Sequence, residues 1–177
     1  MGMSRGFTLI ELMVTIAVMA IIAMMAAPSF GNLVAEKRLN SEVQDLVSTL
    51  TDARGQAAAL RKRITIKFQT GTNTSTVYYW VPKSDDISMD DADQDISFSD
   101  VTYTPVGVPS QREVDKPNPA YDETQPTDLS TDPPTNPQTI KVIVPLKFKL
   151  CNSKIEQSRI INVSLNGTVQ KIEKGTC

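Results

Sequence analysis

The sequence predicts an α+β protein in which one long N-terminal helix packs on a β-rich head. Three patterns support this prediction: an apolar run at residues 7–27, an apolar helical repeat at residues 39–60, and short strand patterns from residue 64 onward. The chain has 177 residues and a net charge of −2. The part that follows the apolar run is long enough for one domain with its own core.

The apolar run at residues 7–27 is preceded by Arg5 and followed by Pro28. A helix of this length crosses about 30 Å of hydrocarbon, and helix is the conformation that satisfies a single segment's backbone in lipid. The positive-inside tendency places the start of the chain in the cytoplasm and the residues after Pro28 outside. A secretory signal peptide is the alternative, but its apolar core is shorter and Pro28 directly after Ala27 does not suit its cleavage. The sequence therefore favours a membrane-spanning helix.

One carboxylate, Glu11, lies at the start of this apolar run. A charged side chain in a membrane span is costly and needs a functional reason. The segment Phe-Thr-Leu-Ile-Glu that begins at Phe7 follows a six-residue leader, residues 1–6, that ends in Gly6. This arrangement resembles the class III signal of type IV prepilins.

The resemblance implies that a prepilin peptidase cleaves between Gly6 and Phe7 and methylates the new amino group of Phe7. Glu11 then becomes the fifth residue of the mature chain, and its family role is to pair with the amino terminus of a neighbouring subunit. A buried charge is tolerated when it is paired, which agrees with this role. Pro28 matches a family proline that loosens the helix, because its ring removes a backbone N–H.

Beyond Pro28, an apolar repeat predicts that the helix continues through residues 28–63. The repeat places the following residues on one helix face: Leu39, Val43, Leu46, Leu50, Ala53, Ala57 and Leu60. We expect this face to pack on a head formed by residues 64–177. Arg54 and the cations at 61–63 are expected to lie at the C-terminal end of the helix, where positive charge interacts favourably with the helix dipole.

Strand patterns occupy most of the head. They predict strands at residues 64–68, 77–81, 96–103, 139–144, 146–150, 160–165 and 168–172. Asn166-Gly167 is a strong hairpin signal between the last two strands. Residues 105–137 carry eight prolines and are expected to form a long surface loop. The head is therefore expected to be a mostly antiparallel sheet or a small sandwich.

This order of elements resembles the minor pilins and pseudopilins of the GspH/FimT/FimU group. The resemblance is specific at residues 5–30, is only architectural at residues 70–137, and returns at the closing hairpin with Cys151 and Cys177. It implies a periplasmic head and a structural subunit that initiates or caps a type IV pilus. The implied partners are other minor and major pilins and an inner-membrane assembly platform. In an exported chain, the even cysteine pair also favours a disulfide.

Two other functions remain open from the sequence. The first is a minor pseudopilin of the type II secretion system, which the same resemblance covers. The second is a calcium- or ligand-binding head, since Asp91, Asp93 and Asp95 are spaced like the start of a calcium loop. However, Ile96 and Thr102 stand where an EF-hand requires glycine and glutamate. A solvated acidic loop is the preferred interpretation.

DNA binding and catalysis are both disfavoured. Some FimT-type pilins bind DNA through a Gly-Arg-x-Arg turn in the closing hairpin, whereas this chain has Gly-Thr-Val-Gln at residues 167–170. Without these arginines the turn has fewer cations for phosphate contacts. The chain has no histidine and no nucleophile-elbow, phosphate-loop or paired-cysteine metal motif. We therefore expect neither an enzyme nor a bound cofactor.

Overall fold

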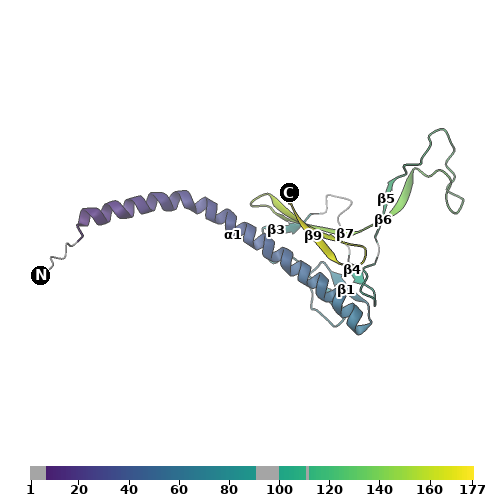
Figure 1. Cartoon of the computed structure of the whole chain (residues 1–177), viewed down its shortest axis with the longest axis horizontal. Helices are drawn as coiled ribbons and strands as arrows, with labels where there is room; N and C mark the ends of the chain where they lie inside the picture. Colours follow the sequence, from purple (N-terminus) through teal and green to yellow (C-terminus); the bar gives the residue numbers. More distant parts are fainter. Residues whose placement is uncertain (1–6, 91–99, 111) are drawn as a thin grey trace.

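The computed structural model describes residues 7–90, 100–110 and 112–177, and it leaves the side chains of residues 25–29 and 112 undescribed. The fold is α+β, with a long N-terminal helix packed on antiparallel sheets, as the sequence predicts (Figure 1). The helix, α1, spans Leu9–Leu60. The described strands are β1 (Ile64–Lys67), β2 (Val77–Tyr79), β3 (Ile87–Met89), β4 (Val101–Tyr103), β5 (Arg112–Pro117), β6 (Thr139–Val144), β7 (Leu146–Asn152), β8 (Gln157–Val163) and β9 (Val169–Thr176).

Helix α1 ends three residues before the predicted boundary. Arg61 adopts the left-handed conformation with φ of 50°, which terminates the helix. The N–H of Lys62 donates to the carbonyl of Ala57 at 3.2 Å and closes the last turn. The last helical turn contains no basic residue, and the cations at 61–63 begin at the C-cap, Arg61. Their interaction with the helix dipole stays a prediction.

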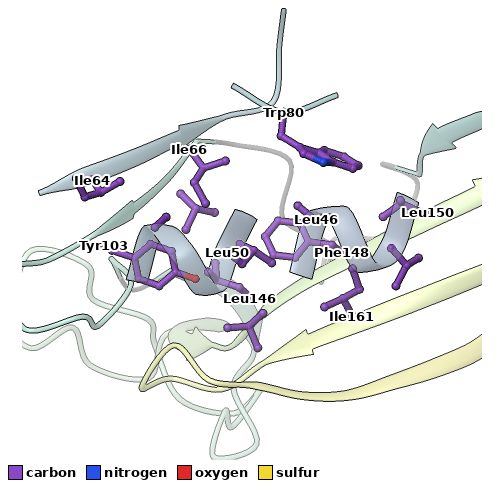
Figure 2. Close-up of a cluster of buried hydrophobic side chains, with 14 of the residues drawn as sticks. Leu46, Leu50, Ile64, Ile66, Trp80, Tyr103, Leu146, Phe148, Leu150 and Ile161 are labelled. Atoms are coloured by element: carbon purple, nitrogen blue, oxygen red, sulfur yellow. The ribbon is translucent and has the colours of Figure 1, made fainter. Parts of the chain in front are cut away.

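The apolar face of α1 packs on the head as predicted, except at its last position. Six side chains of this face are at most 2% exposed: Leu39, Val43, Leu46, Leu50, Ala53 and Ala57. Figure 2 shows Leu46 and Leu50 among side chains of the sheets, such as Phe148 of β7. Burying one leucine contributes about 2 kcal/mol. Leu60, at the end of the helix, is 51% exposed, so its predicted burial is wrong.

Two sheets form the head. One has the strand order β2-β1-β4, and the other has the order β3-β7-β8-β9. All pairings in the two sheets are antiparallel except that of β1 with β2, which is parallel. The hairpin predicted at Asn166-Gly167 joins β8 to β9, and Gly167 adopts a φ of 82° that favours glycine. The head is therefore mostly antiparallel.

The proline-rich segment contains a strand that the sequence does not predict. β5 lies within residues 105–137 and pairs with β6, so the expectation of a loop throughout is wrong for Arg112–Pro117. The two strands form a separate two-stranded sheet that extends away from the head (Figure 1). We call this feature, residues 112–144, the arm. The predicted strand at 96–103 is present as β4, and its residues 96–99 lie outside the described part of the chain.

The expected membrane span is not confirmed. Within the portion of the chain that the structure describes, no helix combines the length and apolar character needed to cross a membrane. The expected segment, 7–27, includes residues 25–27, whose side chains are not described.

Candidate assembly site

The start of α1 is held by a capping box between Thr8 and Glu11. The Thr8 hydroxyl accepts the Glu11 N–H at 3.3 Å, and Glu11 Oε2 accepts the Thr8 N–H at 3.3 Å. Each side chain thereby satisfies a backbone N–H that the first helical turn leaves without a partner. This Thr-x-x-Glu signal is visible in the sequence, and it gives Glu11 a role within its own chain besides the one predicted between subunits. Phe7 precedes the cap and is 82% exposed, whereas Gly6 lies outside the described residues.

The N-terminal half of α1 presents apolar side chains that the head does not cover. Those at least half exposed are Phe7, Leu9, Ile10, Leu12, Met13, Val14, Ile16, Val18, Met19, Ile21, Ile22, Met24, Phe30 and Leu33. Figure 1 shows this half extending away from the head. An exposed apolar surface of this extent marks an interaction site. Pro28 lies within α1, and its side chain is outside the described part.

A buried arginine connects α1 to β8 where the helix reaches the head. Arg159 is 3% exposed and places Nη2 2.8 Å from Glu36 Oε1. Its Nε donates to Asn40 Oδ1 at 3.0 Å, and its Nη1 donates to the Ser158 carbonyl at 2.9 Å. Lys174 of β9 approaches the same Glu36 oxygen at 3.3 Å. The guanidinium is therefore paired and hydrogen-bonded, as a buried charge requires.

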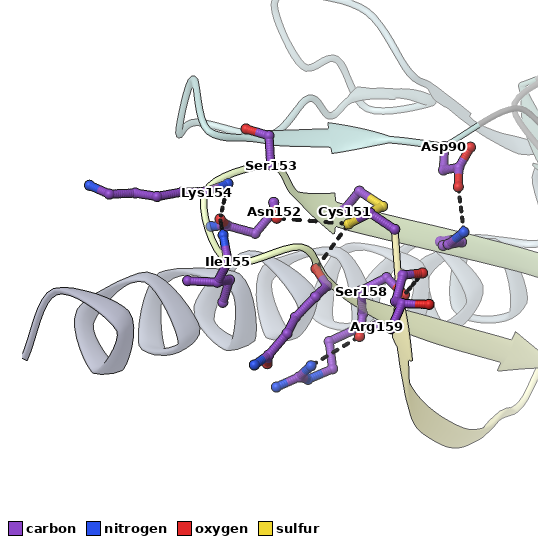
Figure 3. The surroundings of a disulfide bond; sticks show 12 residues. Asp90, Cys151, Asn152, Ser153, Lys154, Ile155, Ser158 and Arg159 are labelled. Atoms are coloured by element: carbon purple, nitrogen blue, oxygen red, sulfur yellow. Dashed lines mark hydrogen bonds and ion pairs between the residues drawn. A yellow bond between two sulfur atoms is a disulfide. The ribbon is translucent and has the colours of Figure 1, made fainter. Parts of the chain in front are cut away.

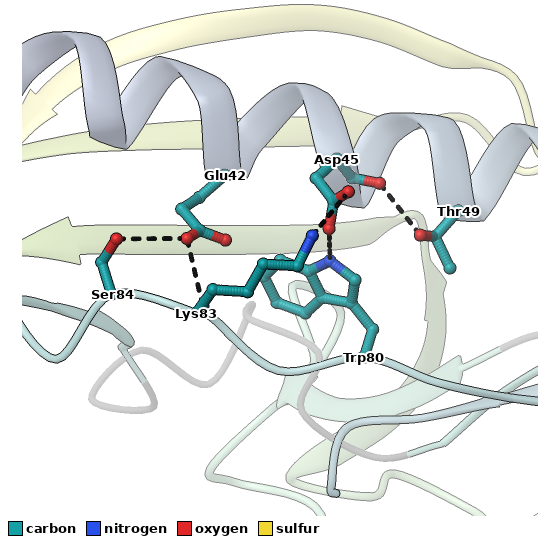
Figure 4. Close-up of polar contacts among 6 residues, drawn as sticks. All are labelled: Glu42, Asp45, Thr49, Trp80, Lys83 and Ser84. Carbon is teal, nitrogen blue, oxygen red and sulfur yellow. Dashed lines mark hydrogen bonds and ion pairs between the residues drawn. The ribbon is translucent and has the colours of Figure 1, made fainter. Parts of the chain in front are cut away.

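A second polar cluster joins α1 to the segment after β2 (Figure 4). The Trp80 indole N–H donates to Asp45 Oδ2 at 2.8 Å, and Lys83 Nζ lies 3.1 Å from Asp45 Oδ1. Glu42 is only 6% exposed, and its Oε1 accepts the Lys83 N–H at 3.1 Å and the Ser84 hydroxyl at 3.2 Å. Neither cluster could be predicted from the sequence, because the partners lie far apart in the chain.

A disulfide joins Cys151 of β7 to Cys177 at the C-terminus, with a Cα–Cα distance of 5.6 Å (Figure 3). β8 lies between β7, which carries Cys151, and β9, which precedes Cys177. The Cys177 N–H also donates to the Glu156 carbonyl at 3.2 Å. The pairing expected for an exported chain is thus present, and it holds β9 in the sheet.

Tyr103 is a buried titratable group of the head. Its side chain is 0% exposed, and its hydroxyl has no hydrogen-bond partner among the described residues. Burial raises the pKa of Tyr103 to about 12, because the charged phenolate loses its hydration, while the nearby Arg54 opposes this shift. Arg54 itself donates from Nε to the Gly107 carbonyl at 3.1 Å instead of acting at the helix end.

The candidate calcium ligands Asp91, Asp93 and Asp95 lie outside the described residues. In the described parts of the chain, no three acidic or cysteine side chains lie close enough together to hold a metal ion. The described residues therefore form a capped apolar helix half that extends away from the head, and a head that is packed on the other half.

Residues 1–27 match the family model described as the prokaryotic N-terminal methylation motif. This motif indicates a type IV pilin-like or pseudopilin protein. It implies processing by a prepilin peptidase and assembly with other pilins, and it suggests a membrane-anchored, pilus-assembled protein. Searches of curated proteins and of solved structures found no match. The motif does not extend into the head, so membership of the GspH/FimT/FimU group stays a prediction.

Proposed function

We propose that this chain is a minor type IV pilin, a structural subunit of the complex that initiates or caps the pilus. The observation that carries the proposal is that the methylation motif at residues 1–27 includes most of the exposed apolar half of α1. A helix of this kind serves a protein that first anchors in a membrane and later packs among other helices. The polar clusters at Arg159 and Glu42 support the role, because they fasten the head to the part of α1 that follows.

In this proposal residues 7–27 anchor the chain in the bacterial inner membrane, with the amino terminus in the cytoplasm and the head in the periplasm. Cleavage after Gly6 then exposes the amino group of Phe7. Glu11 pairs with that group on a neighbouring subunit when the helix leaves the membrane for the filament. The Glu11 carboxylate thus changes partner: before assembly it binds Thr8 in the capping box, and after assembly it binds the amino group of a neighbouring subunit.

The proposed role is non-catalytic and involves no direct contact with DNA. Twitching motility, adhesion or DNA uptake would be properties of the assembled filament. In this proposal the head acts only through its contacts with other pilins in the filament.

Gene deletion tests the proposal against the minor pseudopilin of type II secretion. We expect the deletion strain to lose surface pili, counted by electron microscopy, and to keep its secreted proteins. Expression of the wild-type chain from a plasmid should restore the pili and is the control. Normal pili with lost protein secretion would overturn the proposal and favour the pseudopilin.

A further inference from the structure

Within the part of the chain that the structure describes, no strand outside the arm pairs with it. β5 and β6 pair with each other and with no other described strand. A strand of six residues extends about 20 Å, so the tip stands well away from the head. An isolated two-stranded sheet is marginally stable in water and usually needs a packing partner. The arm is therefore expected to pack on another molecule, and the exposed side chains between β5 and β6 indicate the chemistry of that partner.

Internal hydrogen bonds order the tip, which we define as residues 118–138. The N–H groups of Asp128 and Thr135 each donate to the other residue's carbonyl, at 3.0 and 2.9 Å. Asn136 Nδ2 donates to the carbonyls of Asp122 and Gln125, both at 2.8 Å. The tip is thus a shaped surface, and at its end Leu129 is 72% exposed.

The tip carries only negative charge. Its four acidic residues are Asp122, Glu123, Asp128 and Asp132, and it contains no lysine or arginine. A hydrogen bond from the Thr124 hydroxyl lowers the pKa of Asp122. A hydrogen bond from the Ser130 hydroxyl lowers the pKa of Asp128 in the same way. Glu123 and Asp132 have no ion-pair or hydrogen-bond partner among the described residues.

The end of α1 presents the opposite charge. Arg61, Lys62 and Arg63 are exposed, and their side chains have no partner in the described part of the chain. Leu60 beside them is 51% exposed. The loop that packs on this end of the helix adds Val106, which is 76% exposed. We call these five residues the basic end of the head.

We propose that the arm tip of one subunit docks on the basic end of a second copy of this chain. The tip offers four carboxylates and the exposed Leu129, and the basic end offers three cations with Leu60 and Val106, so the two surfaces are complementary in charge and both include apolar side chains. Figure 1 shows the arm on the side of the head away from the C-terminal end of α1, so a subunit does not cover its own basic end. Such a head-to-tail contact joins two different surfaces of identical subunits, so it is heterologous.

Site-specific photocrosslinking in cells that express the full chain tests this contact. A p-benzoylphenylalanine placed at Leu129 should yield a cross-linked dimer whose peptides join the tip to residues 60–63 or 106. Charge reversal with Lys62→Glu and Arg63→Glu should lower the yield at least about tenfold, because like charges then oppose each other. Glu123→Lys with Asp132→Lys makes the tip neutral overall and should also lower the yield, because the net attraction to the basic end is lost. These two carboxylates were chosen because they hold no hydrogen bond in the tip.

The variant with all four substitutions is the matched control. It places two lysines of the tip opposite two glutamates of the basic end, so the yield should rise above that of either double variant. Recovery also excludes misfolding as the cause of the losses. A cross-link to another protein, a cross-link within one chain, no cross-link at all, or no recovery in the fourfold variant would each overturn the proposal.

Discussion

Arg159 and Glu36 form an ion pair that joins β8 to α1, with Nη2 2.8 Å from Oε1. The arginine side chain is 3% exposed and the glutamate side chain 33% exposed, so the pair lies at the boundary between core and solvent. It is placed just before Leu39, the first fully buried leucine of the apolar helix face. The pair therefore marks where the free half of α1 ends and the packed half begins.

Arg159→Met should destabilise the head by about 2–3 kcal/mol, because Glu36 and Asn40 lose a buried partner. This loss is smaller than that for a fully buried pair, since Glu36 is partly exposed and keeps Lys174. Lys174→Met is the matched control and should change stability by less than about 1 kcal/mol, because Lys174 is largely exposed. Urea unfolding followed by the signal of Trp80 measures both variants, and equal effects would contradict a special role for Arg159.

Reduction of the disulfide should destabilise the head by about 3–4 kcal/mol, the loop-entropy estimate for its 26-residue separation. The double variant Cys151→Ser, Cys177→Ser should match the reduced wild-type chain in unfolding midpoint. Non-reducing peptide mapping of protein from the cell envelope should find the cross-link. Free thiols in protein prepared without reductant would show that the bond does not form.

Processing should occur between Gly6 and Phe7, followed by methylation of Phe7. Intact-mass measurement of membrane-extracted protein should show loss of the first six residues and gain of one methyl group. A strain that lacks the prepilin peptidase is the control and should retain the full-length mass. A mature chain that begins near Ser29 would instead indicate a secretory signal peptide.

Substitution at Glu11 should separate the capping role from the assembly role. Glu11→Gln keeps a side chain that can complete the capping box but removes the charge. We expect it to remain in the membrane fraction and to fail in pilus assembly, because a neighbour's amino group stays unpaired in an apolar stack at a cost of several kcal/mol. Piliation of the anchored variant is the measurement, and normal piliation would rule out charge pairing.

Thr8→Ala is the matched control for this experiment. It removes the cap, which should weaken the helix start by about 1 kcal/mol, and leaves the Glu11 charge in place. We expect this variant to assemble pili.

Tyr103 should make the head sensitive to alkaline pH. Its pKa is about 12 in the folded chain against an ordinary value of 10.0, so the folded state holds the phenol proton more tightly than the unfolded state. Stability is unaffected below pH 10.0 and falls as pH rises toward 12, by up to about 3 kcal/mol. Tyr103→Phe should lack this loss and should change stability little near neutral pH, because the hydroxyl has no partner among the described residues. Phenolate absorbance and urea unfolding across this range test both expectations.

The helix and most strands could be predicted because their signals are local. The apolar spacing from Leu39 to Ala57 and the Asn166-Gly167 turn specify their conformations through neighbouring residues. The parallel pairing of β1 with β2 could not be predicted, because it depends on which strands meet after the chain collapses. β5 could not be predicted because its charged residues and Pro117 lack the apolar alternation of a strand. Its strand conformation depends on pairing with β6.

The candidate site divides in the same way. The methylation motif and Glu11 are contiguous in the sequence and were recognised from it. The capping box was equally visible as Thr8 and Glu11 but was overlooked. The link between Arg159 and Glu36 spans 123 residues, and no local pattern distinguishes that arginine from an exposed one.

The way α1 is attached determines how the head responds to a mechanical pull. Tension on the N-terminal half acts along the helix axis, so it loads the buried face from Leu39 to Ala57 in shear. This face is about 27 Å long, and its side chains must slide past the sheets together rather than separate one by one. Arg159 meets the tension first, because Glu36 lies on the pulled side of that face. At the far edge of the sheet, the Cys151–Cys177 bond keeps β9 from peeling away, so the two ends of the head are each secured by a different kind of bond.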